Sequence, residues 1–197
     1  MTDRSITEIK QHCYKVSITC ILLSFICLST TSNAAEELEE SHVENSLFSF
    51  RLKPRTPEQM VAFYEARGFP KSALNLIKKT CYLTGIVHNK STDTIWLELK
   101  YWRFYTDQRE IKRFDRRYWN AQWDWINLPP AYRSTFRWTL IPETLDYLPG
   151  EEEGGNILLP FTKDFISVRA TFSTGENKQG KKITISTDNL FCAEDTQ

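Results

Sequence analysis

The chain has 197 residues, 41% of them hydrophobic, and its 25 basic residues balance its 25 acidic residues. This length suits one globular domain with room for a proper core. Because a nucleic-acid-binding domain carries a clear basic excess, the charge balance excludes a nucleic-acid partner. It also gives no general attraction to an anionic membrane surface.

Residues 1–34 have the parts of a secretory signal peptide. Three basic residues precede an apolar run over residues 16–28, and small residues end the segment at Ala34. The run is about 13 residues long, whereas a membrane helix needs roughly 20. We therefore expect cleavage near Ala34, a periplasmic or secreted protein, and no stable membrane insertion after cleavage.

The leader determines how the cysteines are interpreted. Cys81 and Cys192 are the two that remain after cleavage, and in an oxidising compartment they are most simply one structural disulfide. Closing a loop of this length contributes about 4–5 kcal/mol to the free energy of unfolding. Two alternatives stay open for the leader: an uncleaved membrane anchor, and lipid attachment at Cys20 or Cys27. Neither cysteine is preceded by the Gly or Ala that a lipobox requires.

Residues 35–55 are predicted as a flexible acidic tether, because they begin with a run of glutamates and show little apolar periodicity. Leu47, Phe48 and Phe50 are the side chains of this segment that would dock on the domain. The single globular domain is then expected over residues 56–197.

Residues 57–79 are predicted as a helical hairpin at the start of this domain. Thr56 is a good N-cap and Gln59 completes a capping box with it. Gly68 suits the end of the first helix, and a second helix follows and ends near Lys79.

From residue 81 onward, apolar residues alternate with polar ones, which indicates strands. Residues 94–105 form the clearest strand, and a short helix is expected at 115–124. Further strands are predicted at residues 80–88, 109–114, 134–141, 156–161, 164–174, 182–187 and 189–192. The chain is therefore predicted to be mainly β with a small α part. Its core is an antiparallel β-sandwich over residues 80–193, immunoglobulin-like in outline, with one cysteine in its first strand and the other in its last.

Residues that commonly carry catalysis or bind metals are sparse. His42 and His88 are the histidines left after cleavage, and neither has a companion at metal-ligand spacing, so no metal and no cofactor is predicted. Residues 151–156 are acidic but lack the ligand spacing of a calcium site, and they are predicted to be a solvated turn. A hydrolase with a carboxylate pair stays an alternative, and the acids that would have to converge are Glu98, Asp115, Asp124, Glu143 and Asp146.

All six tryptophans lie between Trp96 and Trp138. Trp119 and Trp123 are four residues apart, so on a helix they share one face. Flat indoles beside arginine can stack on sugar rings or anchor a protein partner. The alternative explanation is that these aromatics plug one end of the sandwich. The candidate binding residues are Arg116, Tyr118, Trp119, Trp123 and Trp125.

These patterns predict an exported, soluble, non-catalytic binding or interaction module of the cell envelope. Its partner would be an envelope protein or a glycan, met through an exposed edge strand or through the aromatic segment. A glycan-binding protein that uses Trp119 and Trp123 is the first alternative, and the hydrolase is the second.

Overall fold

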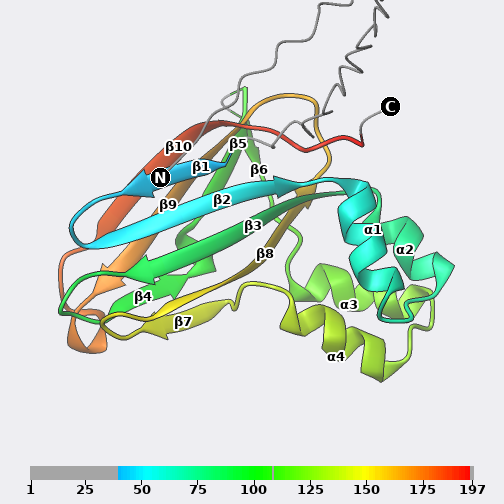
Figure 1. Ribbon diagram of the computed structural model, residues 1–197, viewed down its shortest axis with the longest axis horizontal. Coiled ribbons are helices and arrows are strands. Elements are labelled where there is room, and N and C mark those ends of the chain that lie inside the picture. Colours follow the sequence, from blue (N-terminus) through cyan, green and yellow to red (C-terminus); the bar gives the residue numbers. More distant parts are fainter. Residues whose placement is uncertain (1–39, 108, 196–197) are drawn as a thin grey trace, which may run out of the picture. The chain divides into compact units, whose positions relative to one another are not determined.

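The computed structural model describes residues 40–107 and 109–195. The predicted signal peptide and the first residues of the predicted tether lie outside this part of the chain. The described part is mainly β, with two antiparallel sheets and four α-helices (Figure 1). None of these helices is long and apolar enough to cross a membrane.

The first sheet, sheet A, has four antiparallel strands in the order β1-β2-β3-β8. Their bounds are Ser41–Glu44 for β1, Phe48–Arg55 for β2, Thr80–Asn89 for β3 and Glu152–Pro160 for β8. The prediction of a flexible tether over residues 35–55 is therefore wrong for residues 41–44 and 48–55. Phe48, Phe50 and Leu52 alternate along β2 and are buried, so they belong to the sheet itself.

The second sheet, sheet B, is built around β9. This strand pairs with β10 along one edge, and with β4 and then β5 along the other. β7 extends the sheet beyond β4, and β6 extends it beyond β5. The bounds are Ile95–Glu98 for β4, Arg103–Thr106 for β5, Arg109–Ile111 for β6, Thr144–Tyr147 for β7, Ile166–Thr174 for β9 and Ile183–Leu190 for β10.

The prediction of one continuous strand over residues 94–105 is wrong, because a 3-10 turn, η1 (Leu99–Tyr101), separates β4 from β5. In an unbroken strand, Leu99 and Trp102 would point to opposite faces. The turn changes the alternation, so that both side chains are buried while Tyr101 is exposed. Burial of a second large apolar side chain accounts for the interruption.

The main core lies between the two sheets. Phe50 of β2 packs edge-on against Trp102, with 5.2 Å between ring centroids. Phe172 of β9 completes this group, 6.1 Å from Phe50 and 5.4 Å from Trp102. Aromatic pairs in this geometry add to the stabilisation that burial itself provides.

A second core lies between sheet A and the four helices, which cover one end of the sheet (Figure 1). Tyr82 of β3 and Leu158 of β8 contribute to this core, whereas their neighbours Cys81 and Leu159 point into the main core. The helix bounds are Pro57–Glu65 for α1, Lys71–Ile77 for α2, Arg116–Trp125 for α3 and Pro130–Trp138 for α4. Sheet A is thus buried on both faces at this end.

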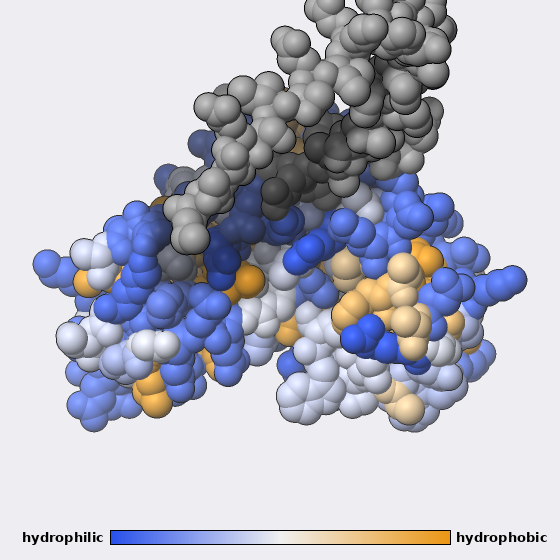
Figure 2. Space-filling model, in the orientation of Figure 1, coloured by the Kyte–Doolittle hydropathy of each residue, from blue (hydrophilic) through white to orange (hydrophobic). Residues whose placement is uncertain are grey.

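Figure 2 shows how polarity is distributed over one face of the protein. Hydrophilic side chains cover the strands, whereas apolar ones gather over α1. In this helix Val61 is half-buried and Ala62 is exposed. Thr56 and Gln59 form a complete capping box at its start.

The strand predicted at residues 134–141 is wrong, because α4 occupies residues 130–138. Pro130 lies in the first helical turn, where a missing backbone N–H is of no consequence. Phe136 is the buried residue of α4. The helix therefore buries one large ring, and the alternation of polar and apolar residues along it is coincidental.

The structure contains the disulfide between Cys81 and Cys192, with 5.1 Å between the Cα atoms. Cys81 lies in the third strand of the chain and not in the first, because β1 and β2 precede it. Three residues after the disulfide, the Asp195 carboxylate accepts a hydrogen bond from the backbone N–H of Glu58 at 2.6 Å. The C-terminal segment therefore contacts the first turn of α1.

Candidate functional site

Helix α3 buries two residues of the predicted aromatic cluster and leaves the others exposed. Trp119 and Trp123 are 2% and 1% exposed, and their rings stack with 4.8 Å between centroids, against Phe136 of α4. An indole with almost no exposed surface offers no face to a sugar ring. The structure therefore removes Trp119 and Trp123 from the candidate ligand-binding residues and gives them a packing role.

Arg116, Tyr118 and Trp125 remain on the surface. Tyr118 is 38% exposed and lies flat on Phe114, with 3.9 Å between ring centroids and 8° between ring planes. Arg116 is exposed in the first turn of α3, whereas Trp125, 77% exposed, is the last residue of the helix. The three residues do not form one site, because Arg116 and Tyr118 line different cavities and Trp125 lines neither of them.

Tyr118 borders a groove of about 580 Å³ that follows the connection between β6 and α3. We call residues 111–118 the basic segment. The walls of the groove come from this segment, from Ala121 in the next turn of α3, and from Pro160 at the end of β8. Its charged lining residues are Lys112, Arg113, Asp115 and Arg117.

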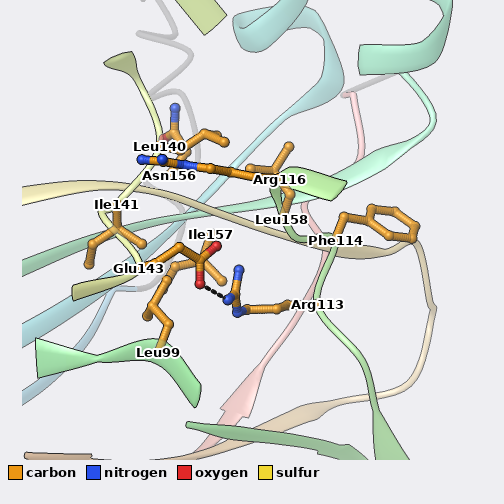
Figure 3. A pocket seen from close by; sticks show the side chains of 10 residues that line it. All are labelled: Leu99, Arg113, Phe114, Arg116, Leu140, Ile141, Glu143, Asn156, Ile157 and Leu158. Carbon is orange, nitrogen blue, oxygen red and sulfur yellow. Dashed lines mark hydrogen bonds and ion pairs between the residues drawn. The ribbon is translucent and has the colours of Figure 1, made fainter. Parts of the chain in front are cut away.

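Three contacts hold the basic segment in place. The backbone N–H of Phe114 donates to the carbonyl of Leu158 in β8 at 2.8 Å. Arg113 forms an ion pair with Glu143, which lies just before β7 (Figure 3). Asp115 caps α3 by accepting a hydrogen bond from a backbone N–H at 2.8 Å. These contacts orient the side chains of the segment before any ligand arrives.

A second cavity, of about 180 Å³, adjoins the groove, because residues 111–113 and Asp115 line both. Lys100 of η1 and Arg103 of β5 also line this second cavity. The two cavities together form one surface on which basic side chains predominate.

The acidic residues around the basic segment are engaged by the protein itself. Glu110 pairs with Arg103 at 3.3 Å and Glu143 pairs with Arg113, while Asp115 caps α3. Among the basic residues of this segment, Lys112, Arg116 and Arg117 make no ion pair and no hydrogen bond within the described part of the chain. The site therefore carries uncompensated positive charge.

Figure 3 shows a third, much smaller cavity of about 10 Å³, beside the Arg113–Glu143 ion pair. A cavity of this size holds about one water molecule. Arg116 extends from α3 across it toward Leu140 and Asn156. This cavity is too small for a ligand, and the ion pair beside it serves to fix the basic segment.

Four of the five carboxylates of the hydrolase alternative make structural contacts, and Asp146 of β7 is the exception. Asp115 caps α3, Glu143 pairs with Arg113, and Asp124 pairs with Arg133 of α4. These contacts give the three carboxylates a structural role.

Glu98 is the carboxylate in the most basic surroundings of this set. The ammonium groups of Lys100 and Lys178 lie 3.0 Å and 3.1 Å from its Oε1 atom. Their hydrogen bonds and charges, Lys100 first, hold the pKa of Glu98 below its usual value. Because a general acid needs a raised pKa, Glu98 is unsuited to that role.

The prediction of a solvated turn at residues 151–156 is wrong, because β8 covers most of them. A Cβ atom on Gly155 would lie 2.4 Å from the backbone nitrogen of Ile141, and one on Gly154 would lie 2.1 Å from the carbonyl oxygen of Gly85. The glycines therefore let neighbouring backbones approach closely. Among the described residues, no group of three or more His, Cys, Asp or Glu side chains could hold a metal ion.

Comparison with known proteins adds little to this geometry. No family model matches the chain, and no curated protein matches it. A crystal structure of ycdA, a candidate lipoprotein from Bacillus subtilis subsp. subtilis str. 168, matches with a TM-score of 0.41 and 12% sequence identity. The match covers 77% of this chain and 39% of that one. A likeness at this level supports no inference about function.

Sequence reasoning found part of this site and missed part of it. Tyr118 was among the predicted binding residues, whereas Lys112, Arg113 and Arg117 were not; Arg116 was predicted but does not line the groove. The signal that identifies them is a pair of basic residues followed by an aromatic residue, which occurs twice, at residues 112–114 and 116–118.

Proposed function

We propose that this chain is an exported, soluble, non-catalytic binding module of the cell envelope that holds an anionic ligand in the groove along the basic segment. One observation carries the proposal: Lys112 and Arg117 line the groove without a protein partner, next to the exposed ring of Tyr118. An anion would pair with these side chains. The groove volume of about 580 Å³ is in the range of small-molecule sites, roughly 300–1,000 Å³.

Two features support export. The leader has the composition of a signal peptide cleaved near Ala34. The disulfide between Cys81 and Cys192 is of a kind that persists in oxidising compartments. Both features support a periplasmic or secreted location.

The proposed partner is an envelope glycan or an envelope protein that presents negative charge. Because the formal net charge of the chain is zero, the attraction is local to the groove. It acts over about 8 Å at physiological ionic strength. Such a short range selects ligands that enter the groove over anions that pass near the protein.

Direct binding of the purified protein to dextran sulfate tests the proposal, with uncharged dextran as the ligand control. We expect binding at about 50 mM salt that weakens as the salt concentration rises. The double variant Lys112→Gln/Arg117→Gln should bind about tenfold more weakly, because two unpaired cations are lost. The control variant Lys71→Gln/Lys181→Gln removes two exposed cations elsewhere and should bind as the parent does.

Two results would overturn the proposal. One is that dextran sulfate does not bind at low salt. The other is that both double variants weaken binding equally, which would show that the attraction is spread over the whole surface. Equal melting temperatures of the parent and the two variants establish that only the charges differ.

A further inference from the structure

We infer that the ligand is an acidic polysaccharide, a linear sugar chain with carboxylate or sulfate groups, that lies along both cavities of the basic segment. The inference rests on the proposed function, because it names the class of anion that the groove would hold. Three observations lead to it: the shared lining of the two cavities, the placement of the basic side chains, and the exposed ring of Tyr118.

The two cavities share part of their lining, and neither is an enclosed pocket. Residues 111–113 and Asp115 line both, and their volumes are about 580 Å³ and about 180 Å³. Both are open to solvent, so a chain that occupies one of them can extend beyond it. A pocket for a single small anion would enclose it on most sides.

Basic side chains occur in both cavities. Arg117 lines the larger cavity, Lys112 and Arg113 line both, and Lys100 and Arg103 line the smaller cavity. A ligand with one negative group would use only part of this set. Lys112 and Arg117 have no partner in the protein, whereas Arg113, Arg103 and Lys100 also pair with Glu143, Glu110 and Glu98. A chain with a negative group on successive units would pair with the two free cations and compete for the others, so the distribution favours a polymer.

Tyr118 favours sugar units over other polymeric anions. One face of its ring is covered by Phe114 at 3.9 Å, yet the side chain remains 38% exposed. Its hydroxyl makes no hydrogen bond within the described part of the chain. An amphipathic ring of this kind gives a sugar both an apolar surface to stack on and a hydroxyl to bond with. Polyphosphate can accept a hydrogen bond from the hydroxyl but has no apolar face to stack on the ring.

The test compares heparin-derived disaccharide, tetrasaccharide and hexasaccharide by isothermal titration calorimetry. We expect affinity to rise on the order of tenfold from disaccharide to hexasaccharide, since more cations are engaged. Tyr118→Ala should weaken hexasaccharide binding about tenfold, and Tyr118→Phe, which keeps the ring, should lose much less. Polyphosphate and polyglutamate should bind more weakly, and Tyr118→Ala should change their affinity much less.

A second pair of variants tests the smaller cavity. Arg103→Gln should weaken binding of the hexasaccharide but not of the disaccharide, which fits within the larger cavity. Arg103→Lys keeps the positive charge and should bind the hexasaccharide nearly as the parent does. This comparison does not depend on Tyr118, so it remains valid if Tyr118→Ala fails to fold.

The outcomes separate the two proposals. Equal affinity for disaccharide and hexasaccharide would overturn the inference and indicate a site for a small anion. Polyphosphate or polyglutamate binding as tightly as the hexasaccharide would overturn it in favour of a general polyanion site. If no anion binds at all, the proposed function itself fails.

Discussion

Glu98 shows how a single carboxylate fastens a turn to a strand. It lies at the end of β4, and Lys178, one of its two partners, belongs to the 3-10 turn η2 (Glu176–Lys178) between β9 and β10. Lys178 has a φ of 65°, a left-handed conformation that is uncommon outside glycine and asparagine. Its ammonium also lies 5.2 Å from the centre of the Trp96 ring. The ion pair therefore supports an unfavourable backbone conformation.

We predict that acid weakens this contact. Lys100 and Lys178 hold the pKa of Glu98 in the folded protein below the ordinary value of 4.5. Its stabilisation is therefore complete above that value and is lost as the pH falls through the folded-state pKa. Glu98→Gln should lower the free energy of unfolding by about 1 kcal/mol at neutral pH and have little effect near pH 2. Urea unfolding at several pH values measures this difference.

The matched control is Glu65→Gln, which changes an exposed carboxylate of α1. It should leave the stability unchanged at every pH. A deficit of Glu98→Gln that stays constant from neutral to acid pH would contradict the role given to the charge.

For individual residues, the sequence predicts which side chains share a helix face, but it does not predict which of them are exposed. The spacing of Trp119 and Trp123 correctly places them on one face of a helix. Which face is buried depends on Phe136 and Tyr82, which come from α4 and β3. These contacts link distant parts of the chain, so no local pattern contains them. For the same reason, exposure of Tyr118 and Arg116 was beyond sequence reasoning.

The elements of the fold depend on close backbone contacts that only the assembled structure reveals. Residues 139–141 run beside β8, where the backbone N–H of Asn156 donates to Thr139 and the N–H of Ile141 donates to Asn156. Gly155 lies at this crossing. An acidic, glycine-containing stretch resembles a turn in sequence, but here the glycines serve a strand.

We predict that Gly155→Ala destabilises the protein by about 3 kcal/mol, because its Cβ atom would overlap the backbone of Ile141. Gly150→Ala is the matched comparison, since Gly150 has a φ of 84° and open space around it. That variant should cost only about 1 kcal/mol, from backbone strain. Denaturant unfolding of both variants checks the order, and the reverse order would contradict it.

In this chain a local capping signal predicts the start of a helix correctly, whereas short alternating patterns do not reliably predict strands. The capping box at Thr56 is local, so the sequence locates the start of α1 correctly. The interruption at η1 and the helix over residues 130–138 are set by which side chains reach the cores. Tertiary burial overrides short alternating patterns. The immunoglobulin-like outline of the strands stays a prediction.

For the whole molecule, the disulfide joins the two sheets. Cys81 lies in β3 of sheet A, Cys192 lies two residues after the end of β10 of sheet B, and 111 positions separate them in sequence. We predict that Cys81→Ala/Cys192→Ala lowers the free energy of unfolding by about 4 kcal/mol, because the unfolded chain gains freedom. Where the variant remains folded, its affinity for dextran sulfate should match that of the parent, since the groove contains neither cysteine.

Thermal unfolding with and without reductant, together with a thiol assay on the unfolded protein, measures this. Two free thiols in protein recovered from an oxidising compartment would contradict the proposal of export. Loss of dextran sulfate binding by a folded variant would show instead that the groove depends on the bond.

The contact between Asp195 and α1 gives the disulfide a further, local effect. Because Asp195 is only three residues from Cys192, the bond keeps its carboxylate beside the backbone N–H of Glu58. Without the bond, the C-terminal segment would detach more often and the first turn of α1 would open by local unfolding. Amide hydrogen exchange near Glu58 should therefore accelerate in the Cys81→Ala/Cys192→Ala variant by a larger factor than exchange in central β9. In the variant without the disulfide, the helical end of the protein would therefore unfold locally more often than the sheets.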